Sequence, residues 1–420
     1  MKKIYLLLFM LIGATSTFAY DQAVNGQEYY GSNCKAYGLE DGTVAISAYY
    51  LSDEQTDVEF PATIQIWTTE EPSEMTAEYE VSSIGYQGWD FWFDKSGANG
   101  LSSIISITVP EGVKTINGGF WGATALKTLT LPSTLTDISK GWAFEGATAL
   151  TKIYCYAKTP PTLAEKVFAW SIIENKTCTV AVPDGAADAY NEATWTYWTG
   201  FYEANLVHEL TYPSITTAGY STYYNTYGYV MPEGVEGYLI DWTYEGKANL
   251  VKVYNAGDEV YPGLALLWKS TEELTEEKWF TVEALASGGN TATWPVDGES
   301  QAYTTLLNGS QTAATTTYWG SASSDYYYYK LANDGTNGLG WYWGAAEGAA
   351  FESGAHKAWM FIEKSSNARG FIKMFDEPTG VNEVTAKKED VKDIYYDLSG
   401  RRVMNPTKGL YIVNGKKILK

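Results

Sequence analysis

The chain of 420 residues has few histidines, and this scarcity limits the chemistry that it can perform. It has two, His208 and His356, which lie far apart and show neither metal-ligand spacing nor a neighbouring nucleophile-elbow motif. The H-E-x-x-H, C-x-x-C, dinucleotide-binding and phosphate-loop motifs do not occur. The sequence therefore predicts two ordinary surface or strand histidines, no metal site, no cofactor and no catalytic residue.

Cysteine is also scarce. Three cysteines, Cys34, Cys155 and Cys178, cannot form a dense set of disulfides. The strand pattern described below places Cys155 and Cys178 on neighbouring strands with an offset of about four residues, or roughly 13 Å. A disulfide needs Cα atoms within about 7 Å. We therefore expect three buried free thiols.

Basic residues are outnumbered, with 29 Lys and Arg against 50 Asp and Glu and a net charge of −21. This balance argues against a nucleic-acid partner, whose phosphates require a basic surface. No long apolar run follows the N-terminus, so we expect no transmembrane segment. Residues 1–19 combine two lysines, an apolar run and a Thr-Phe-Ala end, a pattern typical of a secretory signal peptide. We expect an exported chain.

Aromatic residues and glycine are abundant, with 34 Tyr, 16 Trp and 40 Gly. Aromatic side chains suit a pleated sheet and glycine supplies its turns, so the composition predicts a mainly β protein. The mature length of about 400 residues suggests two or three domains.

An internal repeat occupies the first half of the chain. Residues 107–132 align with residues 129–155, so that Pro110 matches Pro132 and Gly122 matches Gly146. Each unit offers a short strand of alternating apolar residues, a proline that stops it, and a Phe-x-Gly corner. The strand positions are Ile107 and Val109, Leu129 and Leu131, Ile153 and Cys155, and Val180 and Val182. Because no unit can bury its own apolar edge, the units must stack.

This pattern resembles the BspA-type leucine-rich repeat of bacterial cell-surface proteins over about residues 40–208. The chain departs from the family at Ala123 and Ala147, where cysteine is common. The resemblance implies an N-terminal β cap over 20–56 and a leucine-rich-repeat solenoid over 57–208.

Residues 209–377 alternate polar and apolar side chains between Gly and Pro breaks, which predicts a β-rich, sandwich-like module. This segment resembles modules that exported proteins of Bacteroidetes carry before their C-terminus. Its run Tyr326 to Tyr329 should bury two tyrosines and expose two if the strand alternates.

Residues 378–393 are charged and poor in apolar side chains, so we expect a linker. Residues 394–420 then predict a short β-hairpin with a tight turn at Asn414-Gly415. The acidic chain thus ends in a basic tail, which resembles the C-terminal sorting signal of type IX secretion. The residues that carry this resemblance are Gly409, Tyr411, Val413, Gly415, Lys416 and Lys417.

Four tryptophans are candidate binding residues: Trp89, Trp92, Trp121 and Trp142. Trp121 aligns with the charged Glu145, and Trp142 lies in a local insertion. Either they form an exposed aromatic ladder that binds a ligand, or they pack against an adjoining segment.

The resemblances favour a non-catalytic, exported or surface-displayed binding or adhesion protein of a Gram-negative bacterium. Its partners would be an extracellular protein or glycan and the secretion machinery. One alternative is a glycan-binding accessory protein of polysaccharide utilisation. A glycoside hydrolase with two converging acids is another.

Overall fold

The computed structural model describes residues 23–31, 33–52, 55–67, 77–86, 92–95, 101–138, 141–192, 197–204, 206–244, 246–285, 291–296, 302–320, 323–364 and 369–374, and short strands after residue 394. The chain divides into two compact units, Met1–Met374 and Phe375–Lys420. Many β-sheets and few, short helices make up the described residues, as the composition predicts.

A seven-stranded sheet forms the centre of the repeat region, which we define as the described residues of 57–211. Five strands follow its first strand in sequence order and in parallel. Its members are β4 (Asp57–Glu59), β8 (Ser106–Thr108), β10 (Thr128–Leu131), β12 (Lys152–Cys155), β14 (Thr179–Pro183), β15 (Val207–Thr211) and, antiparallel at the edge, β24 (Val282–Glu283). The register places Ile107, Leu129, Ile153, Val180 and Val207 side by side. The strand positions predicted from the repeat are confirmed except for Val109, which follows β8 directly and is buried.

A second sheet of nine strands contains the other apolar stripe of each repeat. It runs in the order β13 (Thr162–Leu163), β11 (Asp137–Ile138), β9 (Thr115–Ile116), β6 (Ala77–Ile84), β5 (Thr63–Trp67), β1 (Glu28–Gly31), β2 (Cys34–Gly38), β3 (Val44–Leu51) and β7 (Trp92–Lys95). Ile116 and Ile138 are fully buried. They share one apolar cluster with Ile107 and Leu129 of the first sheet. Each repeat thus contributes one strand to each sheet and fills the space between them.

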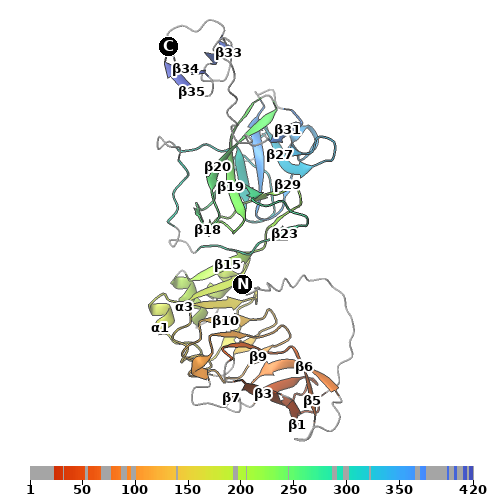
Figure 1. Ribbon diagram of the computed structural model, residues 1–420, viewed down its shortest axis with the longest axis vertical. Helices are drawn as coiled ribbons and strands as arrows, with labels where there is room; N and C mark the ends of the chain where they lie inside the picture. The colour runs from red at the N-terminus through yellow and green to blue at the C-terminus, as the bar shows by residue number, and fades with distance from the viewer. Residues whose placement is uncertain are drawn as a thin grey trace. The chain divides into compact units, whose positions relative to one another are not determined.

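A column of phenylalanines supports the corners of the repeats. Phe120 and Phe144 lie with ring centroids 4.8 Å apart and planes 4° apart, and Phe168 continues the column 5.6 Å further on. The three residues are 24 positions apart in the sequence and nearly inaccessible to solvent. Phe168 then packs on Trp198 and Phe201 of helix α3 (Tyr197–Glu203). Figure 1 shows α1 (Ser171–Glu174) and α3 beside strand β15; α2 (Ala187–Glu192) lies between α1 and α3 in the sequence.

The three cysteines are free and buried, as predicted. Lys152 pairs with Thr179 across β12 and β14, so Cys155 and Cys178 are offset along the strands. Burial raises the pKa of both the Cys34 and the Cys155 thiols to about 11. At neutral pH these cysteines are therefore protonated apolar core residues.

A second nine-stranded sheet, mostly antiparallel, dominates residues 212–374. Its order is β17 (Tyr220–Tyr223), β22 (Leu266–Ser270), β19 (Val235–Tyr244), β20 (Lys247–Tyr254), β31 (Phe371–Met374), β28 (Leu339–Trp343), β27 (Tyr326–Asn333), β30 (Lys357–Glu363) and β25 (Leu307–Ser310). The sheet curls, so that the edge strand β17 approaches β30 near the opposite edge, and the Tyr224 N–H after β17 donates to the carbonyl of His356 before β30. The Leu306 N–H likewise donates to the carbonyl of Ile240.

The expected alternation of the tyrosine run in β27 is wrong. Tyr328 and Tyr329 are both buried, although they are neighbours and point to opposite faces of the strand. Tyr328 packs with Trp359 and Phe361, whereas Tyr329 belongs to a separate cluster with Trp341. Both faces of this strand are covered, so a two-residue alternation of exposure does not develop.

Smaller elements complete the described chain. Three two-stranded ladders pair β16 (Ser214–Ile215) with β23 (Lys278–Trp279), β18 (Tyr229–Val230) with β21 (Glu259–Val260), and β26 (Ala314–Thr315) with β29 (Glu352–Ser353). Two 3-10 turns, η1 (Leu101–Ser103) and η2 (Ala346–Gly348), also occur. Among the described residues, helices stay too short and too polar to span a bilayer.

The second unit contains a sheet in the order β33 (Arg402–Val403), β32 (Tyr395–Tyr396), β34 (Leu410–Val413) and β35 (Lys416–Leu419). Strands β34 and β35 are antiparallel, and Val413 lies opposite Lys416. This pairing confirms the hairpin predicted from the sequence. The predicted signal peptide, the linker 378–393 and the turn residues Asn414 and Gly415 lie outside the described residues.

The phenylalanine column makes a direct prediction about stability. Replacing Phe144 with Ala should lower the free energy of unfolding by about 3–5 kcal/mol, because a ring with neighbours on both faces leaves a cavity. Thr148→Ala, an exposed change four residues away, should alter it by less than about 0.5 kcal/mol. Denaturant unfolding of the two variants measures the difference, and equal losses would contradict a packed column.

Candidate functional site

The corners of successive repeats carry exposed tryptophans. The Trp121 side chain follows Phe120 and is 66% exposed, and Trp142 is 41% exposed. Trp170, two residues after Phe168, is 50% exposed. Because the phenylalanine column aligns these corners, the three indoles belong to neighbouring units. We call Trp121, Trp142, Lys166 and Trp170 the tryptophan edge.

The side chains of two predicted binding residues fall outside what the structure describes. Trp89 lies outside the described residues. Trp92 begins strand β7, where its backbone pairs with that of Ala48, and its side chain lies outside the description. Of the four predicted binding residues, the structure thus describes the side chains of Trp121 and Trp142, and both are exposed.

The backbone at Trp142 is unusual for so large a residue. Its φ is 67°, in the left-handed region that glycine adopts most readily. Gly118, which likewise lies two residues before a corner phenylalanine, has a φ of 103°. Trp142 donates its N–H to the carbonyl of Lys166, which has a φ of 57° in the next repeat. A bulky residue in this conformation costs about 1–2 kcal/mol, so Trp142 is retained against a local preference for glycine.

Trp170 was missed in the sequence, although the repeat could have revealed it. It occupies the position of Gly146, 24 residues earlier, and of Gly122, a further 24 residues back. Those glycines are in close contact, since a Cβ on Gly146 would lie 2.5 Å from the Gly122 nitrogen. At the last corner Trp170 packs on Gly200 and meets the Tyr197 ring edge-on at 5.6 Å. A side chain is tolerated there because a helix, not another repeat, follows.

Charged groups flank the indoles. The Lys166 ammonium lies 6.0 Å from the centre of the Trp142 ring, within range of a cation–π contact. Lys166 and Glu165 are exposed. Flat aromatic faces next to hydrogen-bonding side chains can stack on a sugar ring or anchor a protein surface.

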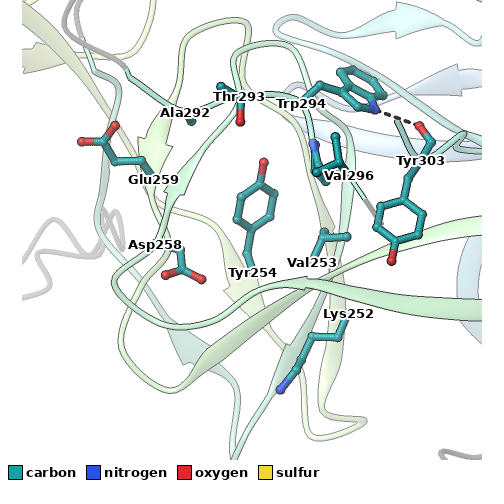
Figure 2. A pocket seen from close by; sticks show the side chains of 11 residues that line it. Lys252, Val253, Tyr254, Asp258, Glu259, Ala292, Thr293, Trp294, Val296 and Tyr303 are labelled. Carbon is teal, nitrogen blue, oxygen red and sulfur yellow. Dashed lines mark hydrogen bonds between the residues drawn. The ribbon is translucent and has the colours of Figure 1, made fainter. Parts of the chain in front are cut away.

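A pocket of about 430 Å³ lies at strands β20 and β21 (Figure 2). Tyr254, Trp294 and Tyr303 contribute aromatic rings to its lining, with Asp258 and Glu259 on another side. Most of its polar groups already have partners within the protein. The Trp294 indole N–H donates to the Tyr303 carbonyl at 2.8 Å, and Lys252 forms an ion pair with Glu236. Glu259 Oε2 accepts from Thr291, and Asp258 Oδ2 accepts from the Asn255 N–H. The carboxylates of this pocket therefore accept hydrogen bonds from its own loops.

Both histidines of the chain lie between the repeat region and the segment 212–374. His208 on β15 contacts Glu283 Oε1 on β24 through Nδ1, and the Lys152 ammonium contacts the same oxygen. Burial opposes ionisation of Glu283, but the hydrogen bond from His208 and the Lys152 charge together lower its pKa. The edge strand β24 is thus fixed to the parallel sheet by charge as well as by backbone pairing.

His356 makes the second pair. Its Nε2 lies 2.9 Å from Asp184 Oδ2, and its Nδ1 lies 3.0 Å from the Tyr224 carbonyl. Both partners accept, so the doubly protonated ring satisfies both. Burial alone would lower the pKa of His356, but Asp184, the Tyr224 carbonyl and Glu209 together raise it above 6.5. Sequence inspection gave no sign of this pair, because its members are 172 residues apart.

Four of the six residues that carry the resemblance to a sorting signal lie on described strands of the second unit. Tyr411 and Val413 lie on β34 and Lys416 and Lys417 on β35, and Gly409 lies outside the described residues. Within the described ranges, His, Cys, Asp and Glu nowhere gather in a group of three suited to a metal ion.

The His356 pair predicts a pH-dependent stability. A raised folded-state pKa adds stability that is complete below the unfolded value of about 6.5 and disappears as the pH rises through the folded value. His356→Gln should therefore lose on the order of 1 kcal/mol near pH 6 and less near pH 8. Urea unfolding of both proteins across this range tests the prediction. His208 is present in both proteins, so its contribution cancels in the difference between them. A loss of unfolding free energy that is constant or grows with pH would contradict a stabilising His356–Asp184 pair.

No protein-family model and no curated protein matches the chain. A solved structure of a leucine-rich repeat protein from Bacteroides ovatus is similar over 40% of this chain and 36% of its own length. The sequence identity is 20% and the TM-score 0.24. The matched part thus spans about a third of the length of that protein.

Proposed function

We propose that this protein is a non-catalytic, exported binding protein that recognises an extracellular glycan through the tryptophan edge. The observation that carries the proposal is the exposure of three indoles, Trp121, Trp142 and Trp170, at the corners of neighbouring repeats. Leaving that much aromatic surface in water is unfavourable unless it is covered in a complex.

The backbone of Trp142 supports the same proposal. Strain in a bulky residue at a corner that glycine fits better is often found at functional sites. Sugar rings present flat faces of C–H groups that stack on indole, while their hydroxyls bond to charged neighbours such as Lys166 and Glu165. An extracellular protein that buries the indoles as anchor residues is the second candidate partner.

The proposed architecture is a leucine-rich-repeat solenoid of the BspA type, followed by a β-sandwich-like module and a sorting tail. In-register parallel strands and the phenylalanine column support the solenoid. The curled nine-stranded sheet supports a separate β-module. In such a solenoid the corners form a continuous edge, along which a linear polysaccharide could contact several units.

Binding by the tryptophan edge can be separated from folding. Trp121→Ala with Trp142→Ala should reduce retention in affinity gels that contain extracellular polysaccharides by about tenfold, because each lost stacking contact costs on the order of 1 kcal/mol. The free energy of unfolding should change by less than about 1 kcal/mol, because both indoles are exposed.

The matched control is Trp242→Ala, which removes an indole of similar exposure on β19, away from both the tryptophan edge and the pockets. It should leave retention unchanged. Equal retention of the double variant and the native protein would refute the glycan proposal. Equal loss with the control would show non-specific adsorption to aromatic surface. Capture of a protein ligand that depends on the same two tryptophans would favour the second candidate.

The basic tail supports a proposed route to the surface of a Gram-negative bacterium. If residues 394–420 are a sorting signal, deleting residues 396–420 should move the protein from the surface or medium to the periplasm. Fractionation followed by intact-mass analysis measures both location and removal of the tail. Unchanged location with the tail still attached would leave it a structural β-sheet without a sorting role.

A further inference from the structure

A second pocket, of about 590 Å³, opens where the parallel sheet of the repeat region meets the segment 212–374. Parallel strands end at a common edge, and this edge brings Lys158, Asp184 and Tyr212 together after β12, β14 and β15. Trp279 of β23, His356 and Lys357 line the pocket from the other side. We call it the junction pocket.

The side chains that line the junction pocket include more basic than acidic groups, although the buried Glu209 lies behind His356 and Asp184. Asp184 is paired with His356 at 2.9 Å, so these two charges compensate each other. Two lysines remain, Lys158 and Lys357. Neither has a carboxylate within ion-pair distance among the described residues. In a chain with a net charge of −21, this local excess of positive charge stands out.

Lys357 is the more informative of the two lysines. It is half-buried at the start of β30, and its ammonium donates a long hydrogen bond of 3.5 Å to the Ser221 hydroxyl. Burial lowers the pKa of its ammonium, and the charge of Glu277 opposes part of this effect. A cation withdrawn from water without a close counter-ion is unfavourable, so an anion that enters the pocket recovers part of the lost solvation.

The walls of the junction pocket suit a ring. Tyr212 is 43% and Trp279 is 38% exposed at its rim. Below them, the Tyr223 ring stacks on His356 at 5.8 Å with planes 14° apart. The Tyr223 hydroxyl is already engaged by Thr211 and Asn225, so this part of the pocket offers ring surface more than free hydrogen-bond donors. A pocket of this volume with apolar walls and few charged groups is typical of a small-molecule site.

We propose that the junction pocket binds a ring-shaped carboxylate of the hexuronic-acid type, with Lys357 and Lys158 facing the carboxylate and Trp279 and Tyr212 facing the ring. The same chemistry is offered by a free acidic monosaccharide and by the end of an acidic polysaccharide. The site goes beyond the proposed function, because none of its residues belongs to the tryptophan edge.

Calorimetric titration of the full mature chain with D-glucuronate tests the site. We expect saturable binding of D-glucuronate and weaker binding, by about tenfold, of D-glucose, which lacks the charge, and of acetate, which lacks the ring. Methyl glucuronoside, which resembles a chain end, distinguishes the sources: tighter binding than the free acid indicates a polysaccharide end, and weaker binding indicates the monosaccharide. Failure of glucuronate to bind, or equal binding of glucose or acetate, would overturn the proposal.

Three variants connect the binding to the lysines. Lys357→Met keeps the length of the side chain and should weaken glucuronate binding by about tenfold or more. Lys158→Met, on the exposed rim, should weaken it severalfold without affecting folding. Lys127→Met removes the same charge from an exposed position outside the pocket and should have no effect. Unchanged affinity in both Lys357→Met and Lys158→Met would overturn the assignment.

The Trp121→Ala, Trp142→Ala protein separates this site from the tryptophan edge. It should bind glucuronate as the native chain does, even where polysaccharide retention is lost. Loss of glucuronate binding in this double variant would overturn the proposal of an independent pocket.

Discussion

Stacking of the repeats on one another is the constraint on which the repeat region depends. A single unit has a strand of three or four residues, a buried isoleucine or leucine on each sheet, and one phenylalanine at its corner. None of these is shielded from water within its own unit. The rings of Phe120, Phe144 and Phe168 contact one another only because successive strands align, so register and core form together.

The same constraint determines where aromatic side chains can be exposed. Residues beside the phenylalanine column cannot turn inward, because the column fills the corner. Trp121 therefore remains outside, immediately after the fully buried Phe120. Trp142 remains outside at a left-handed position, and Trp170 at a position where close packing of repeats otherwise demands glycine. The exposed side chains of this edge can differ between units while the core stays the same, which is a common feature of repeat proteins.

Two electrostatic pairs connect the parallel sheet of the repeat region with the segment 212–374. His208 with Glu283, and His356 with Asp184, each join a residue of the repeat region to one of the segment 212–374. Backbone pairing of β15 with β24 accompanies them. Because Asp184 is paired with His356, the nearby lysines of the junction pocket have no carboxylate within ion-pair distance among the described residues, and this supports the proposed binding site.

The sequence by itself determined the elements that depend on local pattern. The alternating apolar residues, the prolines and the Phe-x-Gly corners predicted the strands, their register and the offset of Cys155 from Cys178. Asn414-Gly415 predicted the hairpin of β34 and β35. Only the tertiary structure decided which faces are covered and which distant charges meet. Tyr328 and Tyr329 are both buried because a second cluster covers the far face of β27, and His356 meets Asp184 across 172 residues. Burial and long-range pairing depend on what packs against a segment, and the segment's own sequence does not contain that information.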